Sequence, residues 1–176
     1  MSGAPGAAFA AAALLDLQDA PVDVCNFYHG ELGGFGMFTE QGVPLKVYQA
    51  FRAFQGLMET SGRVAIRGAV AGKIACAAGM SADGREAGLL VSNFADPRSE
   101  LVLNWQGFAW AGGVTAEIRI VDAGNDFTKA RSEPVADESP ALHLTLKAPA
   151  VALIRLRPTD GARAGTTLSG SSPAQN

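Results

Sequence analysis

The stretch that decides the fold is Lys73–Asn93, which reads KIACAAGMSADGREAGLLVSN. Two mostly apolar runs, Lys73–Met80 and Glu86–Asn93, flank the turn sequence Ser81-Ala82-Asp83-Gly84. Asp-Gly between two such runs is a strong local signal for a β-hairpin, because both residues tolerate the backbone angles of tight turns. The stretch therefore predicts two antiparallel strands joined by a short turn.

The alternating pattern continues toward the C-terminus. Leu142, Leu144 and Leu146 alternate with polar residues, as in a strand with one face toward a core. Short strands separated by turn residues, with no helical pattern between them, predict an antiparallel β-sandwich. The seven expected strands are Val64–Arg67, Lys73–Met80, Glu86–Asn93, Ser99–Trp105, Val114–Val121, Ala141–Lys147 and Val151–Arg157.

The residues before this β-rich part follow a different pattern. Pro5–Gln18 is rich in alanine and leucine and predicts a helix with proline in its first turn. Val22–Tyr28 is a short, mostly apolar run that predicts a buried strand of a parallel sheet, and Gly30–Gly36 predicts a loop. Apolar residues at helical spacing from Val47 to Met58 predict an amphipathic second helix.

A helix, a buried strand and a helix make an incomplete unit, because a single parallel strand needs neighbours for its backbone. A (β/α)8 barrel takes about 250 residues, more than the 176 residues of this chain. We therefore expect a mainly β protein in which residues 1–62 are the terminal fragment of a (β/α)8 barrel. Residues 63–158 form the β-sandwich domain, and the polar tail 159–176 is expected to be disordered.

The composition argues against several classes of function. The net charge is -3 and the 14 Lys and Arg residues are scattered, so nucleic acid is not expected as a partner. No apolar run has the ~18 residues of a membrane helix. Ala7–Leu15 has no basic residue before it and is followed by Asp16, so it does not predict a signal peptide, and the compartment stays open.

No pattern predicts a metal or a cofactor. His29 and His143 have no ligand partners at metal-binding spacing, and Asp122–Asp126 lacks the later acidic ligands of a calcium loop and predicts a turn. Cys25 and Cys76 stand far apart among apolar residues, which favours buried free thiols over a disulfide.

Two sets of residues resemble known enzymes. Val22-Asp23, Gly33-Gly34-Phe35-Gly36-Met37, Gly42-Val43-Pro44-Leu45-Lys46-Val47-Tyr48 and Ala50-Phe51 resemble the end of the catalytic barrel in family 39 glycoside hydrolases. Leu89–Phe94, Ile118–Asp122 and Val151–Leu156 resemble the β-sandwich that follows the barrel in these enzymes. The resemblance implies the C-terminal part of a retaining, xylosidase-like glycosidase.

The catalytic glutamates that this resemblance implies are not in the sequence. Retaining glycosidases place two carboxyl groups about 5–5.5 Å apart, and the family carries them in an Asn-Glu-Pro motif and on a later strand, both upstream of the region matched here. Glu40 and Glu133 stand in superficially similar motifs, but in reversed order, and both are expected to be solvated loop carboxylates. The chain alone is therefore expected to have no catalytic residue and no activity.

The resemblance places the remaining substrate contacts on Asn26, Tyr28, His29 and Glu31, where a barrel strand would end. Tyr28 would stack on a sugar ring, or else be a core aromatic of the barrel fragment. The exposed barrel fragment would promote self-association. The alternative is a non-catalytic β-sandwich module that binds carbohydrate or another partner, with Trp105 and Trp110 on an exposed face. The helix at Lys46–Met58 separates the two, since only the alternative requires it to pack on the sandwich.

Overall fold

A computed structural model describes the chain except residues 1, 33, 108–109, 111–112, 136–140 and 160–176. The described part contains two helices, α1 (Ala4–Leu17) and α2 (Lys46–Met58), which come before all of its strands. The strands are β1 (Gly62–Val64), β2 (Ile74–Met80), β3 (Ala87–Asn93), β4 (Glu100–Asn104), β5 (Val114–Val121), β6 (Asp126–Val135), β7 (Ala141–Thr145) and β8 (Ala150–Pro158).

The strands form two antiparallel sheets. The larger has the order β1-β2-β3-β8-β5-β6, and the smaller pairs β4 with β7. The last strand, β8, lies in the middle of the larger sheet between β3 and β5. Its residues from Ala150 to Ile154 are all buried, because a central strand covered on both faces turns no side toward water.

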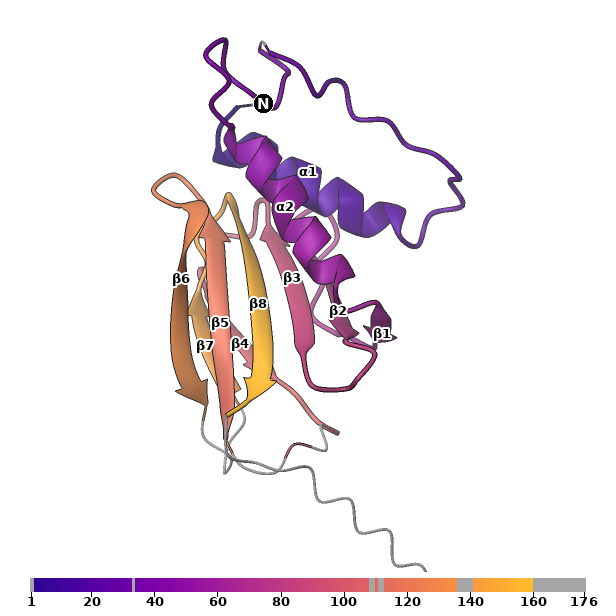
Figure 1. The fold of residues 1–176 in the computed structure, drawn as a ribbon, viewed down its shortest axis with the longest axis vertical. Coiled ribbons are helices and arrows are strands. Elements are labelled where there is room, and N and C mark those ends of the chain that lie inside the picture. The colour runs from indigo at the N-terminus through magenta and orange to yellow at the C-terminus, as the bar shows by residue number, and fades with distance from the viewer. Residues whose placement is uncertain (1, 33, 108–109, 111–112, 136–140, 160–176) are drawn as a thin grey trace, which may run out of the picture.

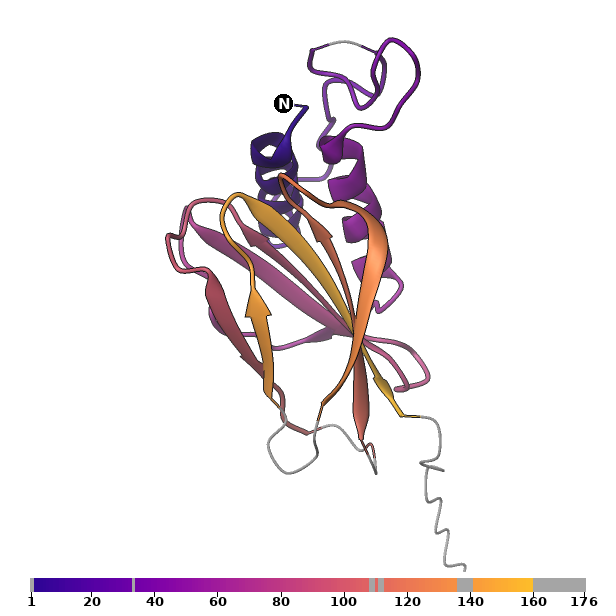
Figure 2. The same ribbon diagram turned by 90° about the vertical axis from the view of Figure 1, so that its left-hand side faces the viewer.

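The two helices cover one face of the larger sheet, and the smaller sheet lies on the other face (Figures 1 and 2). On β3, Leu90 belongs to the apolar cluster beneath the helices, whereas Val91 belongs to the cluster between the two sheets. This alternation follows from the period of two along a strand. Ala7, Ala8 and Ala11 are fully buried in α1, so its small side chains bring this helix close to the sheet.

Two consecutive polar residues of β3 join the three layers. Ser92 and Asn93 are both fully buried. The Ser92 hydroxyl donates to the Ala8 carbonyl of α1 at 2.7 Å, and the Asn93 amide nitrogen donates to the Leu146 carbonyl, just after β7, at 2.8 Å. Their side chains point to opposite faces of the sheet, so Ser92 fastens the helices and Asn93 fastens the smaller sheet.

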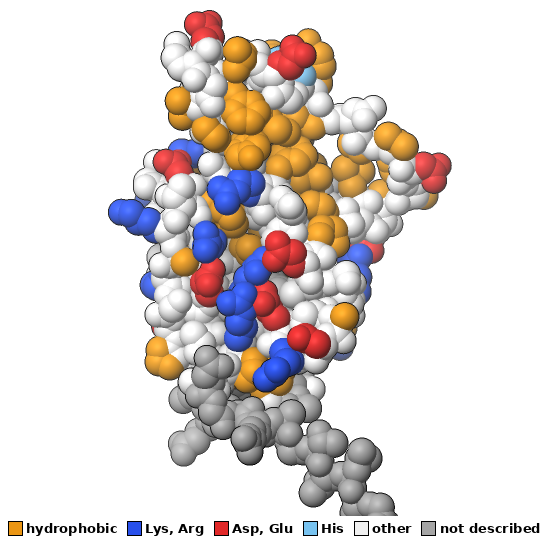
Figure 3. All heavy atoms as spheres, viewed as in Figure 1, with side chains coloured by type: hydrophobic (Ala, Val, Ile, Leu, Met, Phe, Trp, Pro, Cys, Tyr) orange, Lys and Arg blue, Asp and Glu red, His pale blue; other side chains and the backbone are white. Residues whose placement is uncertain are grey.

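The outer part of the helix-covered face carries charges of alternating sign (Figure 3). Arg155 of β8 pairs with Glu59 beside the end of α2 and lies 3.1 Å from Glu86. Glu86 also accepts from Arg157 at 2.7 Å, and this contact raises the pKa of Arg157. These pairs connect the end of α2 with β8 and the start of β3.

The coarse expectation of a mainly β chain with two helices and antiparallel sheets is confirmed. The helix predicted at Pro5–Gln18 is α1, and the amphipathic helix predicted from Val47 to Met58 is α2. The hairpin predicted around Asp83-Gly84 joins β2 to β3. Gly84 adopts a positive φ of 68° in this turn, which glycine does at little cost.

The strand predicted at Val22–Tyr28, the central element of the barrel remnant, is wrong. This segment has no strand pairing, and Val24 is 73% exposed. An apolar run forms a parallel strand only beside other strands, and none of the strands of the described residues pairs with this segment.

Three further expectations need correction. The first predicted strand, Val64–Arg67, lies mostly outside β1, which ends at Val64. Strand β6 was missed altogether. Both cysteines are free, but Cys25 is exposed, whereas Cys76 is half-buried and its pKa is raised by burial. The predicted disordered tail, apart from Thr159, lies outside the described residues.

Candidate functional site

The predicted substrate contacts lie on the connection between α1 and α2, which is drawn at the top of Figure 1. Two aromatic pairs fasten this connection to α2. The Phe27 ring meets the Phe51 ring edge-on with centroids 5.1 Å apart, and the Phe38 and Tyr48 rings lie 5.0 Å apart. The residues between Phe27 and Phe38 therefore project from α2 as a loop with two fixed ends.

The four predicted site residues lie together near the first of these anchors. Asn26, Tyr28 and Glu31 are exposed, and His29 is half-buried. The Tyr28 side chain is 77% exposed, and its ring lies 4.6 Å from the His29 ring in an edge contact. The interpretation of Tyr28 as a core aromatic is therefore wrong for the described structure, and its ring is accessible to a ligand.

The loop after Glu31 turns back very tightly. A β-carbon on Gly36 would lie only 1.9 Å from the Glu31 carbonyl oxygen, so only glycine fits at this position. Further on, the Leu45 N–H donates to the Met37 carbonyl at 2.8 Å. The Thr39 hydroxyl accepts from the Val43 N–H at 3.1 Å and closes the turn that contains Glu40. The described glycines Gly34 and Gly36 thus lie in a tightly turning backbone, within the loop that the sequence predicts.

The two glutamates in motif-like settings belong to separate parts of the fold. Glu40 is exposed in the turn after Thr39. Glu133 lies in strand β6, not in a connection as predicted, where it pairs with Arg131 at 3.4 Å. Lys46 at the start of α2 pairs with Asp126 at the start of β6. Glu133 is seven residues beyond Asp126 along β6. At about 3.3 Å per residue, these two residues are roughly 23 Å apart.

No metal centre is seen among the described residues, where no three His, Cys, Asp or Glu side chains gather. The Asp122 carboxylate accepts from the Gly124 and Asn125 N–H groups, each at 2.8 Å, so it shapes the turn between β5 and β6.

None of the described helices is long and apolar enough to cross a membrane.

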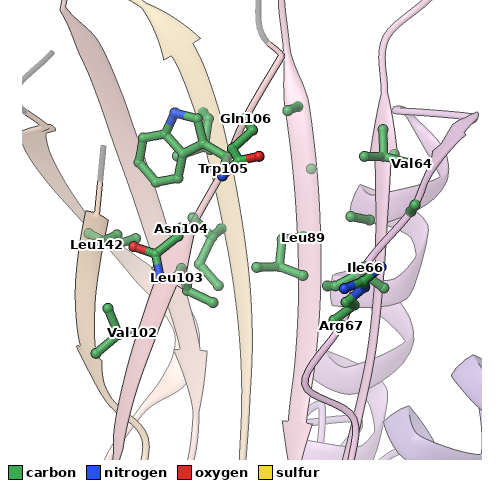
Figure 4. Close-up of a pocket in the computed structure, with 17 residues that line it drawn as sticks. Val64, Ile66, Arg67, Leu89, Val102, Leu103, Asn104, Trp105, Gln106 and Leu142 are labelled. Carbon is green, nitrogen blue, oxygen red and sulfur yellow. The ribbon is translucent and has the colours of Figure 1, made fainter. Parts of the chain in front are cut away.

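A second candidate site is a cavity of about 650 Å³ between the two sheets. Val102–Gln106, in and after β4, lie on one side of it, Val64–Arg67 lie on the other, and Leu89 of β3 lies between them (Figure 4). Its lining is mostly aliphatic, with the Trp105 ring and the polar side chains of Arg67, Asn104 and Gln106. No sequence signal pointed to it, because it depends on how the sheets are paired.

The two tryptophans do not form the exposed face considered from the sequence. Trp105 and Trp110 are both half-buried and pack against the apolar cluster between the sheets. The Trp110 indole N–H donates to the Gly84 carbonyl at 2.7 Å. Trp105 lines the cavity, where part of its ring is accessible.

Solved structures with this arrangement are glycoside hydrolases. A glucosidase from Croceicoccus marinus matches 89% of the chain with 20% identity and a TM-score of 0.66. A family 30 subfamily 8 xylanase from Clostridium acetobutylicum matches 89% with 10% identity and a TM-score of 0.69. A family 39 enzyme from Xanthomonas axonopodis pv. citri matches 90% with 13% identity and a TM-score of 0.62.

The fold is that of part of a glycoside hydrolase. The chain spans only 42%, 40% and 41% of the lengths of these three enzymes. No model of a protein family matches the sequence, and no curated protein matches it. The similarity therefore assigns the fold, and members of more than one glycoside hydrolase family share it.

Proposed function

We propose that this chain is the C-terminal part of a retaining, xylosidase-like glycoside hydrolase of the family 39 type. In this proposal the antiparallel sheets are the β-sandwich that braces the catalytic barrel, and residues 1–62 belong to the end of that barrel. The observation that carries the proposal is the coverage: nearly the whole chain matches glycoside hydrolases, yet it accounts for about two fifths of each.

The distribution of exposed apolar side chains supports this proposal. Apolar side chains gather over the two helices and their connection in Figure 3. Most of the exposed large apolar side chains of the described residues lie before residue 62, among them Phe9, Val24, Tyr28 and Phe35. Such a concentration is typical of a surface that another protein part covers. The remainder of a barrel would cover it, and a second copy of this chain would cover it when that remainder is missing.

The chain alone is proposed to be inactive. The full sequence has no Asn-Glu-Pro motif. Glu40 lies in the turn after Thr39 and Glu133 lies in strand β6, on separate elements, whereas double displacement requires two carboxyl groups about 5–5.5 Å apart. Asn26, Tyr28, His29 and Glu31 would form one wall of the sugar site, with Tyr28 as a stacking face and Glu31 as a hydrogen-bond acceptor.

The activity claim is tested with the purified chain and a 4-nitrophenyl β-xyloside. We expect no release of nitrophenol above the rate without protein. Glu40→Gln and Glu133→Gln serve as matched variants, because each removes a charge and keeps the shape of the side chain. Turnover that either substitution abolishes would contradict the proposal.

The proposal that the chain is the C-terminal part of a longer enzyme is tested by sequencing the DNA immediately upstream of the Met1 codon. We expect an open frame that encodes Asn-Glu-Pro and a later strand glutamate, and we expect the longer polypeptide to cleave the xyloside with retention at the anomeric carbon. An in-frame stop codon directly upstream would remove the parent enzyme from the proposal.

One observation favours a second function, a free-standing interaction module. Both helices pack on the larger sheet: Val47, Ala50 and Leu57 of α2 are buried in the same cluster as Leu153 of β8. A module without a barrel requires this arrangement of the helix at Lys46–Met58. A monomeric, stable chain with no open frame upstream would select this alternative.

A further inference from the structure

The turn between β5 and β6 meets the start of α2 (Figures 1 and 2). The Lys46 ammonium, in the first turn of α2, donates to the Asn125 carbonyl at 3.2 Å and pairs with the carboxylate of Asp126, the first residue of β6. The Lys46 side chain is only 20% exposed, so the protein covers most of it. Two consecutive residues therefore hold the N-terminal end of α2.

This turn has a fixed shape of its own. The Asp122 N–H donates to the Asn125 carbonyl at 3.1 Å, and the Asp122 carboxylate accepts from the backbone and the side chain of Asn125. The carbonyl that receives Lys46 thus also closes the turn. Because aspartate and asparagine close such turns with local hydrogen bonds, Asn125 and Asp126 present their acceptors to α2 at fixed positions.

Phe127 adds a third contact to the same helix. Its side chain is 5% exposed and lies in the apolar cluster beneath the helices, which also contains Val47 of α2. The guanidinium carbon of Arg52 of α2 lies 5.7 Å from the centroid of the Phe127 ring, and that of Arg119 of β5 lies 5.8 Å from it. These distances are within the range of cation–π contacts. Residues 125–127 therefore hold the first two turns of α2.

The backbone of Phe127 has an unusual conformation. Its φ is 66°, and the register of β5 and β6 shifts beside it, between Arg119 and Val121. Bulky L-residues rarely adopt a positive φ. Such a conformation persists only where the surrounding structure determines it, often next to functional sites. Here the irregular backbone places the Phe127 ring beneath α2 in place of regular pairing with β5.

Helix α2 in turn holds the stretch that contains the proposed sugar contacts. The Leu45 N–H, the Tyr48 ring and the Phe51 ring fasten the α1–α2 connection to the same two turns of α2. Phe51 contacts Phe27, which directly precedes Tyr28. A short helical segment, stiffened by its own hydrogen bonds, thus connects the β5–β6 turn to the region of Tyr28.

We infer that Asp126 and Phe127 are positioning residues of the proposed sugar site: they fix α2, and α2 fixes Tyr28 and Glu31. The inference rests on the proposed function, because it concerns the sugar contacts of the parent glycosidase. It gives the larger sheet a part in substrate binding in addition to bracing the barrel. A contact group that is misplaced by about 1 Å loses much of its effect, so a loosened α2 should weaken the stacking on Tyr28.

The test in the 176-residue chain uses its two tyrosines, Tyr28 and Tyr48, as probes. The chain is produced with 3-fluorotyrosine, and Tyr28→Phe assigns the two fluorine resonances. We expect Asp126→Lys to shift or broaden both resonances by more than the original linewidth, because two cations then face each other at the start of α2. The double exchange of Lys46→Asp with Asp126→Lys should return both resonances toward their original positions.

Glu133→Lys is the matched control, because it makes the same charge reversal further along β6, and it should leave both resonances in place. Exposed ion pairs contribute little to stability, so the urea midpoint of Asp126→Lys should stay near that of the wild type. If Asp126→Lys does not fold, Asp126→Asn should give a smaller shift of the Tyr28 resonance. An unchanged Tyr28 resonance in a folded Asp126 variant, even with a shifted Tyr48 resonance, would overturn the inference. Failure of the double exchange to restore Tyr28 would overturn it as well.

The part of Phe127 is tested with two substitutions that keep apolar volume. Phe127→Leu removes the aromatic ring, and Arg52→Met removes the cation above it while keeping a long side chain. Each should shift the Tyr28 resonance by more than its linewidth. A Tyr28 resonance that is unchanged in both variants would overturn the role of Phe127.

The kinetic test uses the longer polypeptide that the proposed function predicts. Asp126→Lys should raise KM for the 4-nitrophenyl β-xyloside by about threefold or more and leave kcat within about twofold, because a lost stacking contact weakens ground-state and transition-state binding alike. Glu133→Lys should change neither constant. An active longer polypeptide whose KM does not respond to Asp126→Lys would overturn the inference and leave the proposed function standing. A longer polypeptide without activity would overturn the proposed function instead, and the fluorine spectra would still decide the positioning.

Discussion

The carbonyl oxygen of Thr60 lies so close to Gly79 that a β-carbon on Gly79 would be 1.7 Å from it. Thr60 follows α2, and its hydroxyl donates to the Leu57 carbonyl at 2.7 Å. A β-carbon on Gly88 of β3 would lie 2.4 Å from that hydroxyl oxygen. Two glycines on neighbouring strands thus make room for one residue, which determines how α2 leaves the sheet.

Gly79→Ala should destabilise the protein by about 3 kcal/mol, the upper end of overpacking costs, because the new methyl group meets backbone that cannot turn aside. Urea unfolding monitored by circular dichroism measures this. Gly34→Ala is the control, since a β-carbon there would meet nothing within 4 Å. Gly88→Ala should be rescued in part by Thr60→Ala, whereas Gly79→Ala should not. Equal rescue of both would contradict the contact geometry.

Ser92→Ala should lower the free energy of unfolding by about 1 kcal/mol, since it removes one buried hydrogen bond while helix α1 keeps its own ladder. The amides of α1 should also exchange faster, because the lost bond is the one to Ala8. Ser61→Ala, at an exposed residue just after α2, should change neither quantity. Faster exchange in β7 instead of α1 would show that Ser92 acts elsewhere.

Acid should remove the contribution that the turn after β3 makes to the stability of the folded protein. Asp96 is buried and accepts three hydrogen bonds from Arg98, which hold the pKa of its carboxyl well below the usual aspartate range. The stabilisation is therefore full above about pH 3.9 and declines as the pH falls from there toward the depressed pKa. Compared with Asp96→Asn, the wild type should have the higher urea midpoint at pH 7, and the difference should shrink in acid.

The matched control for this titration is Asp23→Asn, at an exposed residue of the α1–α2 connection. Its urea midpoint should follow that of the wild type at every pH. If the difference in urea midpoint between the wild type and Asp96→Asn stays constant down to pH 2, the substitution acts through packing and not through the charge of Asp96.

Sugar binding by the isolated chain should be weak. Tyr28 and Glu31 supply one stacking face and one acceptor, whereas sugar pockets need several convergent polar groups. We expect xylobiose to bind with a Kd above about 1 mM, which means that the binding free energy is weaker than roughly 4 kcal/mol. In titration calorimetry, Tyr28→Ala should leave this affinity almost unchanged. Micromolar affinity that Tyr28→Ala abolishes would show a complete site, and affinity that Trp105→Ala abolishes would move the site to the cavity.

The parts of the fold that the sequence predicts well are those with local signals. Asp83-Gly84 specifies the β2–β3 hairpin through its own backbone preferences, and the leucines of β7 show which face is buried. Strand β6 has neither signal. It is an edge strand whose buried side chains are mainly Phe127 and Val135, and it carries charged residues and Pro134 between them. Charges and proline protect open edges, so they also conceal the strand from pattern analysis.

The candidate site divides in the same way. The resemblance brings Asn26, Tyr28, His29 and Glu31 to one stretch of chain, and they do lie together on the α1–α2 connection. The cavity beside β4 could not be predicted, because its walls come from Val64–Arg67 and Val102–Gln106, whose approach depends on long-range sheet order. The wrong strand at Val22–Tyr28 has a related cause, since strand formation requires partners that local sequence does not reveal.

The two aromatic anchors of the α1–α2 connection have a consequence for protein engineering. Because Phe27 packs on Phe51 and Phe38 packs on Tyr48, the loop between them begins and ends at fixed points of α2. The loop contributes little to the core beyond Met37. Randomised sequences of varied length can therefore replace residues 28–36 while the anchors are kept, which makes this chain a scaffold for displaying selected binding loops.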